Sequence, residues 1–515
     1  MKIKKFAIVW GSAIIFMLAA FHFTSVEGLA QTPKGVMKGA WHFSISADWL
    51  DPSIATPSSS TNFFPLYIFH DALLKPMPDA VYSPCLAESW TISPDYRVYK
   101  FKLRKGVKFH NGDEVTAEDV VFTFKRYKAG PAAMLHSRIE KLEAENPYLF
   151  SVTFKTPFPD FLEYLLPGAT AIAWIVPKKY IEKVGDTEYK RHPIGAGPYK
   201  FVELKPGVVF VGEAFEDYWR KVPKVKRLEI YGVIERPTRY AMVKRGEVDW
   251  ALSMTEVFYK KVKEDPELRM ETGLSPTVHY IYSAAQFDPK SPWSDARVRK
   301  AASMALDRKP LTDVVYPEAP PVKFIGLPGD PEAAQYPVEP FDPEKAKKLL
   351  AEAGYPTGFN GGKFYTFTEH SAMGEMVATY WKAIGINVEL TPLPRVTWIG
   401  LHNSGKMRGE TFIDMVAAPT INARLNYIFG AKNYGNYPDI KTLWEQYNKA
   451  VDPKDRKDLI MRIQKLMFDR TMVIPLMRAA VPSALGPRVK GNPFKFRGGF
   501  PLWYPVPAED LELKE

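Results

Sequence analysis

The sequence predicts an α/β fold, because stretches with helical periodicity are followed closely by stretches that alternate like strands. Trp381 and Ile384 end one amphipathic stretch, Gly385 stops it, and residues 386–390 then alternate between apolar and polar side chains. In the strand-like segment 99–104, apolar residues alternate with cations, which indicates one buried and one wet face. The chain has 515 residues, too many for one ordinary core, so two or three domains are expected.

The N-terminal segment 1–30 has the layout of a secretory signal peptide. Three lysines among the first five residues precede an apolar run over 6–21, and small residues follow at 28–30. We expect cleavage after Ala30. An uncleaved membrane anchor is the alternative, but the run is short for a membrane span. No cysteine stands directly after the run, so a lipid anchor is not expected, and in a two-membrane bacterium the protein would be free in the periplasm.

The next elements are expected where capping residues and apolar periodicity coincide. Residues 148–154 are expected to pair near the strand at 99–104. Thr116 begins a capping box, and apolar residues behind it supply one face of a helix. Further helices are predicted to begin after Asp295, Asp342 and Asp452, and a strand is predicted over 412–416.

Charge and cysteine content exclude several classes of protein. The formal net charge is +11, and the densest basic run covers 220–227. That run is short and broken by Pro223, so we interpret it as a solvated loop, and export argues against a nucleic-acid partner. Cys85 is the only cysteine, so no intramolecular disulfide or four-cysteine metal site can form, and Cys85 is expected to be a small buried hydrophobe.

No motif in the sequence predicts an enzyme, a cofactor or a metal site. Residues 400–406 fit the start of a phosphate-binding loop, but Met407 stands where the hydroxyl that binds Mg²⁺ belongs. Lys200 replaces the third glycine of a dinucleotide fingerprint, and no nucleophile elbow or zinc-binding helix is present. The nine histidines are dispersed without ligand spacing. A hydrolase is therefore the weakest interpretation of the chain.

Six blocks in a fixed order closely resemble the family 5 extracellular solute-binding proteins, the peptide/nickel/opine-type binding components of ABC importers. The resemblance extends from about residue 41 to about residue 480. The blocks are 86–90 (LAESW), 99–112 (YKFKLRKGVKFHNG), 116–122 (TAEDVVF), 193–201 (PIGAGPYKF), 246–249 (GEVD) and 295–308 (DARVRKA through ALDR). The residue patterns of these segments predict strands, turns and an amphipathic helix, so none of them is expected to be catalytic.

The resemblance implies a two-lobed periplasmic-binding-protein fold of the cluster C type, with a hinge between the lobes. Lobe I would comprise 31–70, 190–280 and 481–515, with an extra subdomain over 71–189, and lobe II would comprise 281–480. The chain would cross between lobes near 277–284 and 478–484. Closure around a small-molecule ligand would then present the protein, expected to be a monomer, to ABC transporter permease subunits in the inner membrane.

The resemblance also places candidate ligand-binding residues in three segments and at one crossing. The candidates are Thr56, Ser58 and Ser59 in the first segment, Arg395 and Trp398 in a loop, Thr420, Asn422, Arg424 and Asn426 in another loop, and Tyr280 and Tyr282 at the crossing. The alternative for each aromatic residue is core packing, and for each polar residue it is solvation.

The third segment departs from the pattern of peptide-binding relatives, which commonly carry an Asp there for the peptide's ammonium group. Residues 417–426 contain no acid, and Arg424 is present instead. Because arginine suits carboxylates and phosphates, a neutral or anionic ligand is expected rather than a peptide held by its amino terminus. A periplasmic chaperone or sensory adaptor on the same scaffold remains the alternative function, and neighbouring permease and ATPase genes would favour import.

Overall fold

The computed structural model describes residues 32–47, 50–54, 63–77, 80–127, 131–166, 174–326, 330, 332–418, 420–429, 437–494 and 507–514. The predicted signal peptide and the candidate residues Thr56, Ser58 and Ser59 lie outside these ranges, so they stay predictions.

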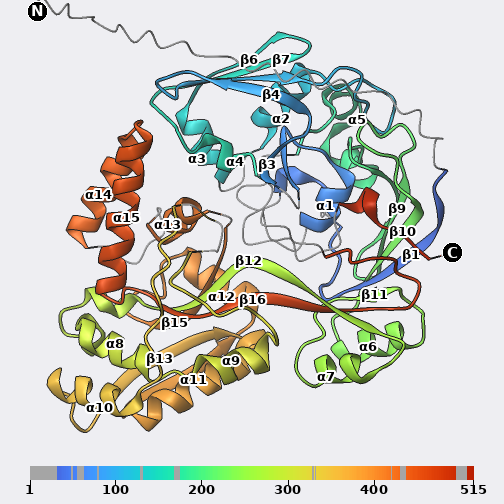
Figure 1. Cartoon of the computed structure of the whole chain (residues 1–515). Coiled ribbons are helices and arrows are strands. Elements are labelled where there is room, and N and C mark those ends of the chain that lie inside the picture. Colours follow the sequence, from blue (N-terminus) through green and yellow to red (C-terminus); the bar gives the residue numbers. More distant parts are fainter. Residues whose placement is uncertain are drawn as a thin grey trace, which may run out of the picture.

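A ten-stranded mixed sheet joins two lobes of the molecule (Figure 1). Its order is β14-β13-β15-β12-β16-β11-β1-β10-β9-β8. We call the half built on β1 and β8–β11 lobe I, and the half built on β13–β15 lobe II. The strands are β1 (Lys34–Trp41), β8 (Tyr199–Lys205), β9 (Val209–Ala214), β10 (Val225–Gly232), β11 (Trp250–Ala251), β12 (Arg269–Ser283), β13 (Phe359–Phe367), β14 (Ile386–Leu393), β15 (Thr411–Ala417) and β16 (Ile474–Leu485).

The long strands β12 and β16 connect the two lobes. They pair antiparallel from Arg269 opposite Leu485 to Ile281 opposite Ile474, and the register shifts between Leu274 and Val278. The end of β16 also pairs with β11 of lobe I, whereas the second half of β12 pairs with β15 of lobe II. The expected boundaries at 280/281 and 480/481 fall inside these strands, and the assignment of segments to lobes stays a prediction.

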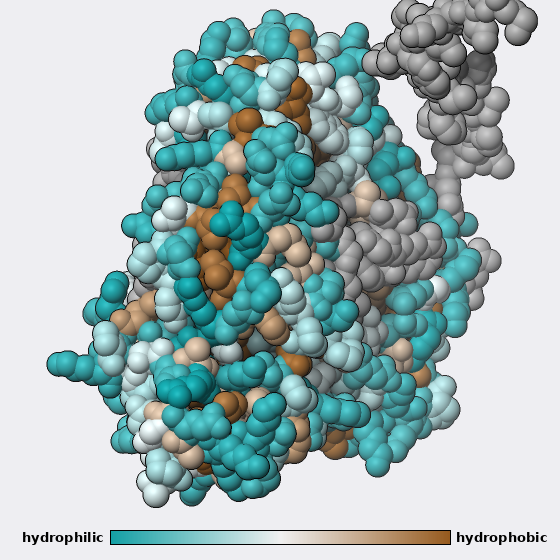
Figure 2. Space-filling model, turned by 60° about the vertical axis from the view of Figure 1, so that its left-hand side comes forward, coloured by the Kyte–Doolittle hydropathy of each residue, from teal (hydrophilic) through white to brown (hydrophobic). Residues whose placement is uncertain are grey.

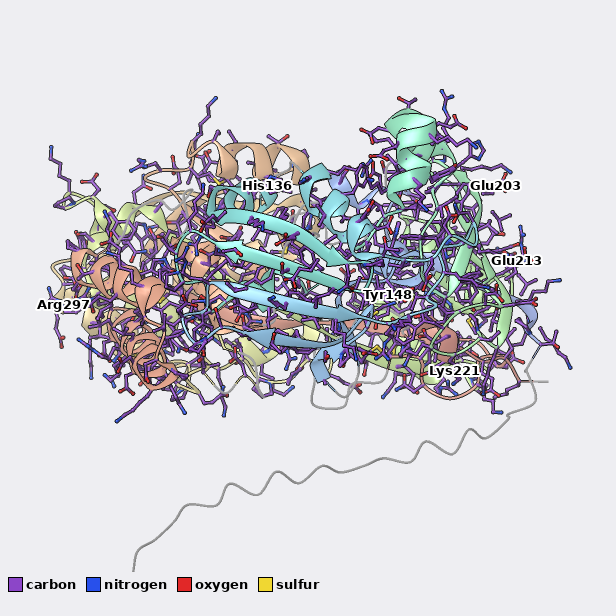
Figure 3. All side chains as sticks on the ribbon, turned by 90° about the horizontal axis from the view of Figure 1, so that it is seen from above. His136, Tyr148, Glu203, Glu213, Lys221 and Arg297 are labelled. Atoms are coloured by element: carbon purple, nitrogen blue, oxygen red, sulfur yellow. The ribbon has the colours of Figure 1, made fainter. Side chains whose placement is uncertain are left out.

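A separate four-stranded antiparallel sheet forms the upper part of the molecule, which we call the upper subdomain. Its order is β4-β5-β7-β6, and Figure 3 shows the four strands side by side from above, with Tyr148 near one end. The predicted strand at 99–104 and its partner at 148–154 are thereby confirmed as β5 and β7. The elements are β2 (Leu74–Met77), β3 (Ala80–Pro84), β4 (Ala87–Ile92), β5 (Val98–Leu103), α2 (Ala117–Arg126), α3 (Pro131–Arg138), β6 (Ile139–Asn146), β7 (Leu149–Phe154) and α4 (Phe161–Tyr164).

Local signals position the helix α2 and the core of the upper subdomain. Thr116 and Asp119 form the predicted capping box, in which the Asp119 carboxylate accepts a hydrogen bond from the Thr116 backbone N–H at 2.9 Å. Phe124 lies on the inner face of α2 and packs against Phe150 with ring centroids 5.2 Å apart. Cys85 lies buried in the same core, as predicted, and burial raises the pKa of its thiol.

Lobe I has its core between the sheet and the helix α1. The Trp41 and Phe64 rings stack with centroids 4.8 Å apart, and Trp250 meets Phe64 edge-on. The remaining elements of this lobe are η1 (Pro52–Ile54), α1 (Phe63–Phe69), α5 (Lys178–Arg191), α6 (Arg236–Lys244), α7 (Val257–Glu264) and η6 (Ala508–Asp510).

Helices cover the sheet of lobe II, and three of their predicted starts are confirmed. Asp295, Asp342 and Asp452 each accept a hydrogen bond from a backbone N–H in the first turn of the helix that follows. Inside the lobe, the Trp381 indole donates to the Ala302 carbonyl at 2.9 Å. The elements are η3 (Ala284–Phe287), η4 (Pro292–Ser294), α8 (Ala296–Met304), α9 (Arg308–Val315), α10 (Pro343–Glu352), η5 (Thr368–His370), α11 (Ser371–Ala383), α12 (Arg395–Asn403), α13 (Ile421–Phe429), α14 (Pro438–Lys449) and α15 (Pro453–Asp469).

The basic run at 220–227 is not the plain solvated loop that was predicted. Its last three residues begin β10, and three of its cations pair with acids near the C-terminus. The pairs are Arg220 with Glu509, Lys221 with Asp510 at 2.6 Å, and Lys224 with Glu512 at 2.6 Å. These pairs hold the C-terminal segment against lobe I and neutralise much of the run.

On the face in Figure 2 hydrophilic residues predominate, and hydrophobic residues show in patches between them. No helix within the described ranges is long and apolar enough to cross a bilayer.

The contact between Gly39 and Trp250 gives a test of core packing in lobe I. A Cβ at Gly39 would lie 1.9 Å from the Trp250 ring, which is buried between β1 and α1. We expect Gly39→Ala to lower the stability by about 1–3 kcal/mol, because an overpacked core must shift.

Gly400→Ala is the matched control, because Gly400 lies in α12 and nothing would lie within 4 Å of its Cβ. This substitution should be neutral or stabilise by up to about 1 kcal/mol. Thermal unfolding of both variants measures the difference, and equal midpoints would contradict the proposed packing.

Candidate functional site

Arg395 and Trp398 lie in the helix α12, so the prediction that a loop carries them is wrong. The Trp398 side chain is buried, and its ring stacks on the His402 ring with centroids 4.8 Å apart. Arg395, at the first turn, is half-buried, with its guanidinium 5.2 Å from the centre of the Phe367 ring. Arg395 therefore keeps some exposed surface, whereas Trp398 has the environment of a core residue.

Residues 421–429 form the helix α13, so the loop predicted for this segment is also wrong. Thr420 caps the helix, since its hydroxyl accepts a hydrogen bond from the Ala423 backbone N–H at 3.2 Å. The Ile421 backbone N–H donates to the Asp330 carboxylate from another part of lobe II. A threonine is a common capping residue, so Thr420 could have indicated the start of α13, but this short helix was not predicted from the sequence.

Arg424 is fully buried within lobe II. Its Nε donates to the Ala418 carbonyl at 2.9 Å and its Nη1 donates to the Ile325 carbonyl at 2.5 Å. Burial lowers the pKa of Arg424 to about 9. The guanidinium therefore fixes two backbone segments in the structure, which differs from the anion-binding role that was predicted for it.

The acid that the third segment lacks in sequence is supplied by another element. Glu163, in the short helix α4 of the upper subdomain, accepts a hydrogen bond from the Asn422 side-chain amide at 3.1 Å. The Asn426 amide donates to the Tyr164 hydroxyl at 3.2 Å. Asn422 and Asn426 therefore face the upper subdomain, and Glu163 was missed because 259 residues separate it from Asn422.

A second contact of α4 links the upper subdomain to lobe II. The Arg456 guanidinium, in α15, donates to the Asp160 carboxylate, and it also lies 4.0 Å from the centre of the Tyr447 ring. We call the whole set the α4 contact. It comprises Asp160, Glu163 and Tyr164 on the upper side and Asn422, Asn426, Tyr447 and Arg456 on lobe II.

Charge and burial act strongly on the carboxylates of the α4 contact. Burial raises the pKa of Glu163, and the neighbouring Asp160 carboxylate raises it further, while hydrogen bonds from Thr420 and Asn422 oppose the shift. Burial also raises the pKa values of Asp330 and Glu332, which lie on the lobe II side. Acids of other elements therefore lie against α13, although the segment itself contains none.

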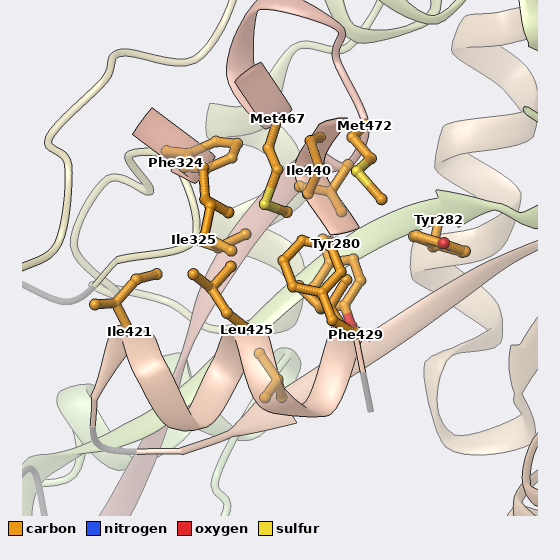
Figure 4. Close-up of a cluster of buried hydrophobic side chains, with 14 of the residues drawn as sticks. Tyr280, Tyr282, Phe324, Ile325, Ile421, Leu425, Phe429, Ile440, Met467 and Met472 are labelled. Atoms are coloured by element: carbon orange, nitrogen blue, oxygen red, sulfur yellow. The ribbon is translucent and has the colours of Figure 1, made fainter. Parts of the chain in front are cut away.

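Tyr280 and Tyr282, at the β12 crossing, are buried in the core of lobe II (Figure 4). The Tyr280 hydroxyl donates to the Asp414 carboxylate at 3.0 Å. The Tyr282 ring packs near the Phe412 ring, with centroids 5.7 Å apart. Both residues have the packing that was the alternative to a ligand-facing role.

The charge of Arg395 acts on three histidines, one in lobe I and two in lobe II. His42 follows β1 of lobe I, and burial together with Arg239, Arg395 and Arg236 lowers the pKa of its imidazole. His279 and His370 of lobe II lie with ring centroids 4.8 Å apart, and burial lowers the pKa of each. These imidazoles are thereby held neutral, and His42 was not singled out by any sequence pattern.

The phosphate-loop-like string at 400–406 begins inside α12 and ends in the turn after it. A phosphate-binding loop precedes its helix, so the order of the elements here is the reverse. Within the described part of the chain, no group of three or more histidine, cysteine or acidic side chains is placed to hold a metal ion.

Known proteins are similar to this chain along most of its length. Heme-binding protein A of Haemophilus influenzae is 28% identical over 471 residues, covering 83% of this chain and 84% of that protein. Glutathione-binding protein GsiB of Escherichia coli K12 is 27% identical over 431 residues, covering 79% of this chain and 82% of that protein.

Solved structures of such proteins have the same fold. NikA from Brucella suis, in complex with Fe(III)-EDTA, superimposes with a TM-score of 0.80 at 21% identity, over 93% of this chain and 100% of that chain. The two-lobed fold expected from the resemblance is thereby confirmed. Residues 81–434 match the bacterial extracellular solute-binding proteins, family 5 Middle, so the chain belongs to the family 5 bacterial extracellular solute-binding proteins.

Proposed function

We propose that this chain captures a small solute between its lobes in the periplasm and delivers it to an ABC importer. The family match over 81–434 carries this proposal, because it includes the strand β12 and the helices α12 and α13 that meet between the lobes. Delivery would be to permease subunits in the inner membrane, with the protein acting as a monomer and without chemical turnover.

Closure is proposed to bring the upper subdomain and lobe II together at the α4 contact. The contact pairs Asp160 with Arg456 and Glu163 with Asn422, so it joins parts of the chain that are far apart in sequence. The ion pair between Asp160 and Arg456 and the hydrogen bond between Asn422 and Glu163 can form only while the upper subdomain touches lobe II. These contacts therefore stabilise the closed arrangement alone. Closure can then be driven by a solute that makes better contacts in this arrangement than in an open one.

The solute is proposed to be a neutral or anionic organic molecule, although the basis for this differs from the sequence argument. The Arg424 guanidinium binds carbonyls within lobe II, whereas Arg395 is half-buried and its charge acts on His42 of lobe I. Similar proteins are named for heme and for glutathione, and one structure holds agropinic acid. We propose that Arg395, Thr420, Asn422 and Asn426 contact the solute, together with Thr56, Ser58 and Ser59.

Native mass spectrometry of the purified 31–515 chain tests solute capture. We expect a bound small molecule whose mass stays unchanged on incubation. Arg395→Ala should weaken its binding by about tenfold or more, because a hydrogen bond to a charged group contributes about 1.5–3 kcal/mol.

Arg191→Ala is the control for the loss of one positive charge, because the Arg191 side chain is 71% exposed on α5. The control should retain the solute fully. If the bound molecule is absent and a thermal-shift screen of small organic anions, peptides and neutral solutes stabilises nothing, the capture proposal is wrong. If the bound molecule is chemically converted, the protein is an enzyme.

The raised pKa of Glu163 predicts a dependence of the α4 contact on pH. The ordinary value for glutamate is 4.5, and burial raises it here, so the protonated form fits the contact better than the ionised form. The stabilisation that this proton provides is present at low pH and is lost as the pH rises through the raised pKa. Glu163→Gln, which cannot ionise but can still accept from Asn422, should raise the melting temperature at pH 7.5.

The advantage of Glu163→Gln over the unmodified protein should shrink as the pH falls toward 4.5, since Glu163 then becomes neutral as well. Glu182→Gln serves as the control, because the Glu182 side chain is 54% exposed on α5 and should show no such trend. A difference between Glu163→Gln and the unmodified protein that is constant across pH would contradict the assigned cause.

A further inference from the structure

Arg478 lies where the strands β12 and β16, which connect the lobes, pass from one lobe to the other. It is in β16 opposite Val278, directly beside the irregular stretch 275–277 of β12. Only 5% of its surface is exposed. Its Nε donates to the Ser275 carbonyl at a long 3.4 Å, and its Nη2 is buried with no hydrogen-bond partner.

In three other deeply buried arginines of the described chain, every side-chain nitrogen donates a hydrogen bond. Arg239 donates to the carbonyls of Val233, Ile234, Leu252 and Ser253. Arg299 donates to the carbonyls of Trp293, Ser294, Arg470 and Thr471. Arg424 donates to those of Ala418 and Ile325. Backbone carbonyls therefore accept hydrogen bonds from these buried guanidinium groups. Arg478 differs, because its buried Nη2 has no such acceptor.

No carboxylate of the described residues compensates the charge of Arg478. Burial alone lowers its pKa, to about 10, and no ion pair involving it is formed among these residues. The charge of Arg478 instead lowers the pKa of Arg424 on α13, which places the two guanidinium groups near each other. Figure 1 shows α13 above β12 and β16, on the side facing the upper subdomain. A buried cation without a partner is costly, so an acceptor is required there.

We propose that Arg478 binds an oxyanion of the solute, a carboxylate or a phosphate, at the hinge between the lobes. This inference rests on the proposed capture of a solute, and it names the chemical group of the solute that the protein recognises. The fork of a guanidinium can donate two parallel hydrogen bonds to either kind of oxyanion. Binding on β16, the strand shared by both lobes, would join solute recognition directly to the element that holds the lobes together.

The stretch 275–277 contributes to the same place without competing for the anion. The Ser275 hydroxyl donates to the Thr277 hydroxyl oxygen at 2.8 Å, and the Thr277 backbone N–H donates to Ser275 Oγ at 3.2 Å. These two side chains bond to each other, and the Nη2 of Arg478 is left for the solute. A purely structural Arg478 would need an acceptor that the described residues do not supply.

Thermal unfolding of the full 31–515 chain in three buffers tests the assignment. The buffers contain sodium acetate, sodium phosphate or sodium chloride at equal ionic strength and pH 7, with the protein freed of any bound solute beforehand. Acetate or phosphate should raise the melting temperature of the unmodified protein over chloride by about 2–4 °C. In Arg478→Met this anion-specific increase should disappear, and the variant should be at least as stable as the unmodified protein in chloride.

Arg191→Met is the control, since it removes an exposed charge and should keep the anion response. General salt effects on stability cancel in this comparison, because they do not depend on one residue. Arg478→Lys keeps the positive charge but cannot donate two parallel hydrogen bonds. It replaces Arg478→Met in the test if the Met variant does not fold. Its response should be reduced relative to the unmodified protein.

Each outcome decides between alternatives. A response to acetate alone identifies a carboxylate, and a response to phosphate alone identifies a phosphate. An equal response in the unmodified protein and in the Arg478 variants, or no response in either, overturns the assignment to Arg478. If native mass spectrometry finds the solute bound equally well by Arg478→Met, solute capture stands and only the role of Arg478 fails.

Discussion

The antiparallel pairing of β12 with β16 is the interaction on which the rest of the structure depends. These two strands are shared by both lobes, so their hydrogen bonds hold together two cores that are otherwise built from separate parts of the chain. The interruption between Leu274 and Val278 lies where their outer partners change from lobe I to lobe II. A ladder whose register shifts at the crossing, and once more between His279 and Tyr280, joins the lobes and provides a place where they can bend.

Contacts away from the hinge determine how closely the lobes approach. The α4 contact brings acids of the upper subdomain against amides, a tyrosine and an arginine of lobe II. Its groups are partly withdrawn from water, so each of them would pay a desolvation cost if its partner were removed. The same withdrawal raises the pKa of Glu163, so the contact favours the protonated form of this carboxyl. A solute between the lobes adds its own contacts to this balance.

The positive charge of the chain is distributed among distinct roles. Arg220, Lys221 and Lys224 pair with acids of the C-terminal segment. Arg239, Arg299 and Arg424 are buried and bind backbone carbonyls, which ties loops to helices. A net charge of +11 is thus compatible with a protein for which no nucleic-acid partner is indicated, because many of the cations serve the fold.

The sequence by itself determined several local elements and the resemblance to the family, although it missed the helices α12 and α13. Asp342 with Pro343, the capping box at Thr116 and the alternation over 99–104 act through neighbouring residues, and each appears as predicted. Only the tertiary structure decided the surroundings of the candidate site. Arg424 was expected in a ligand-binding loop, yet its side chain is buried in the helix α13, and Glu163 reaches Asn422 across 259 residues. Capping and periodicity are short-range effects that a sequence displays, whereas burial and charge pairing depend on which distant segments fold against each other.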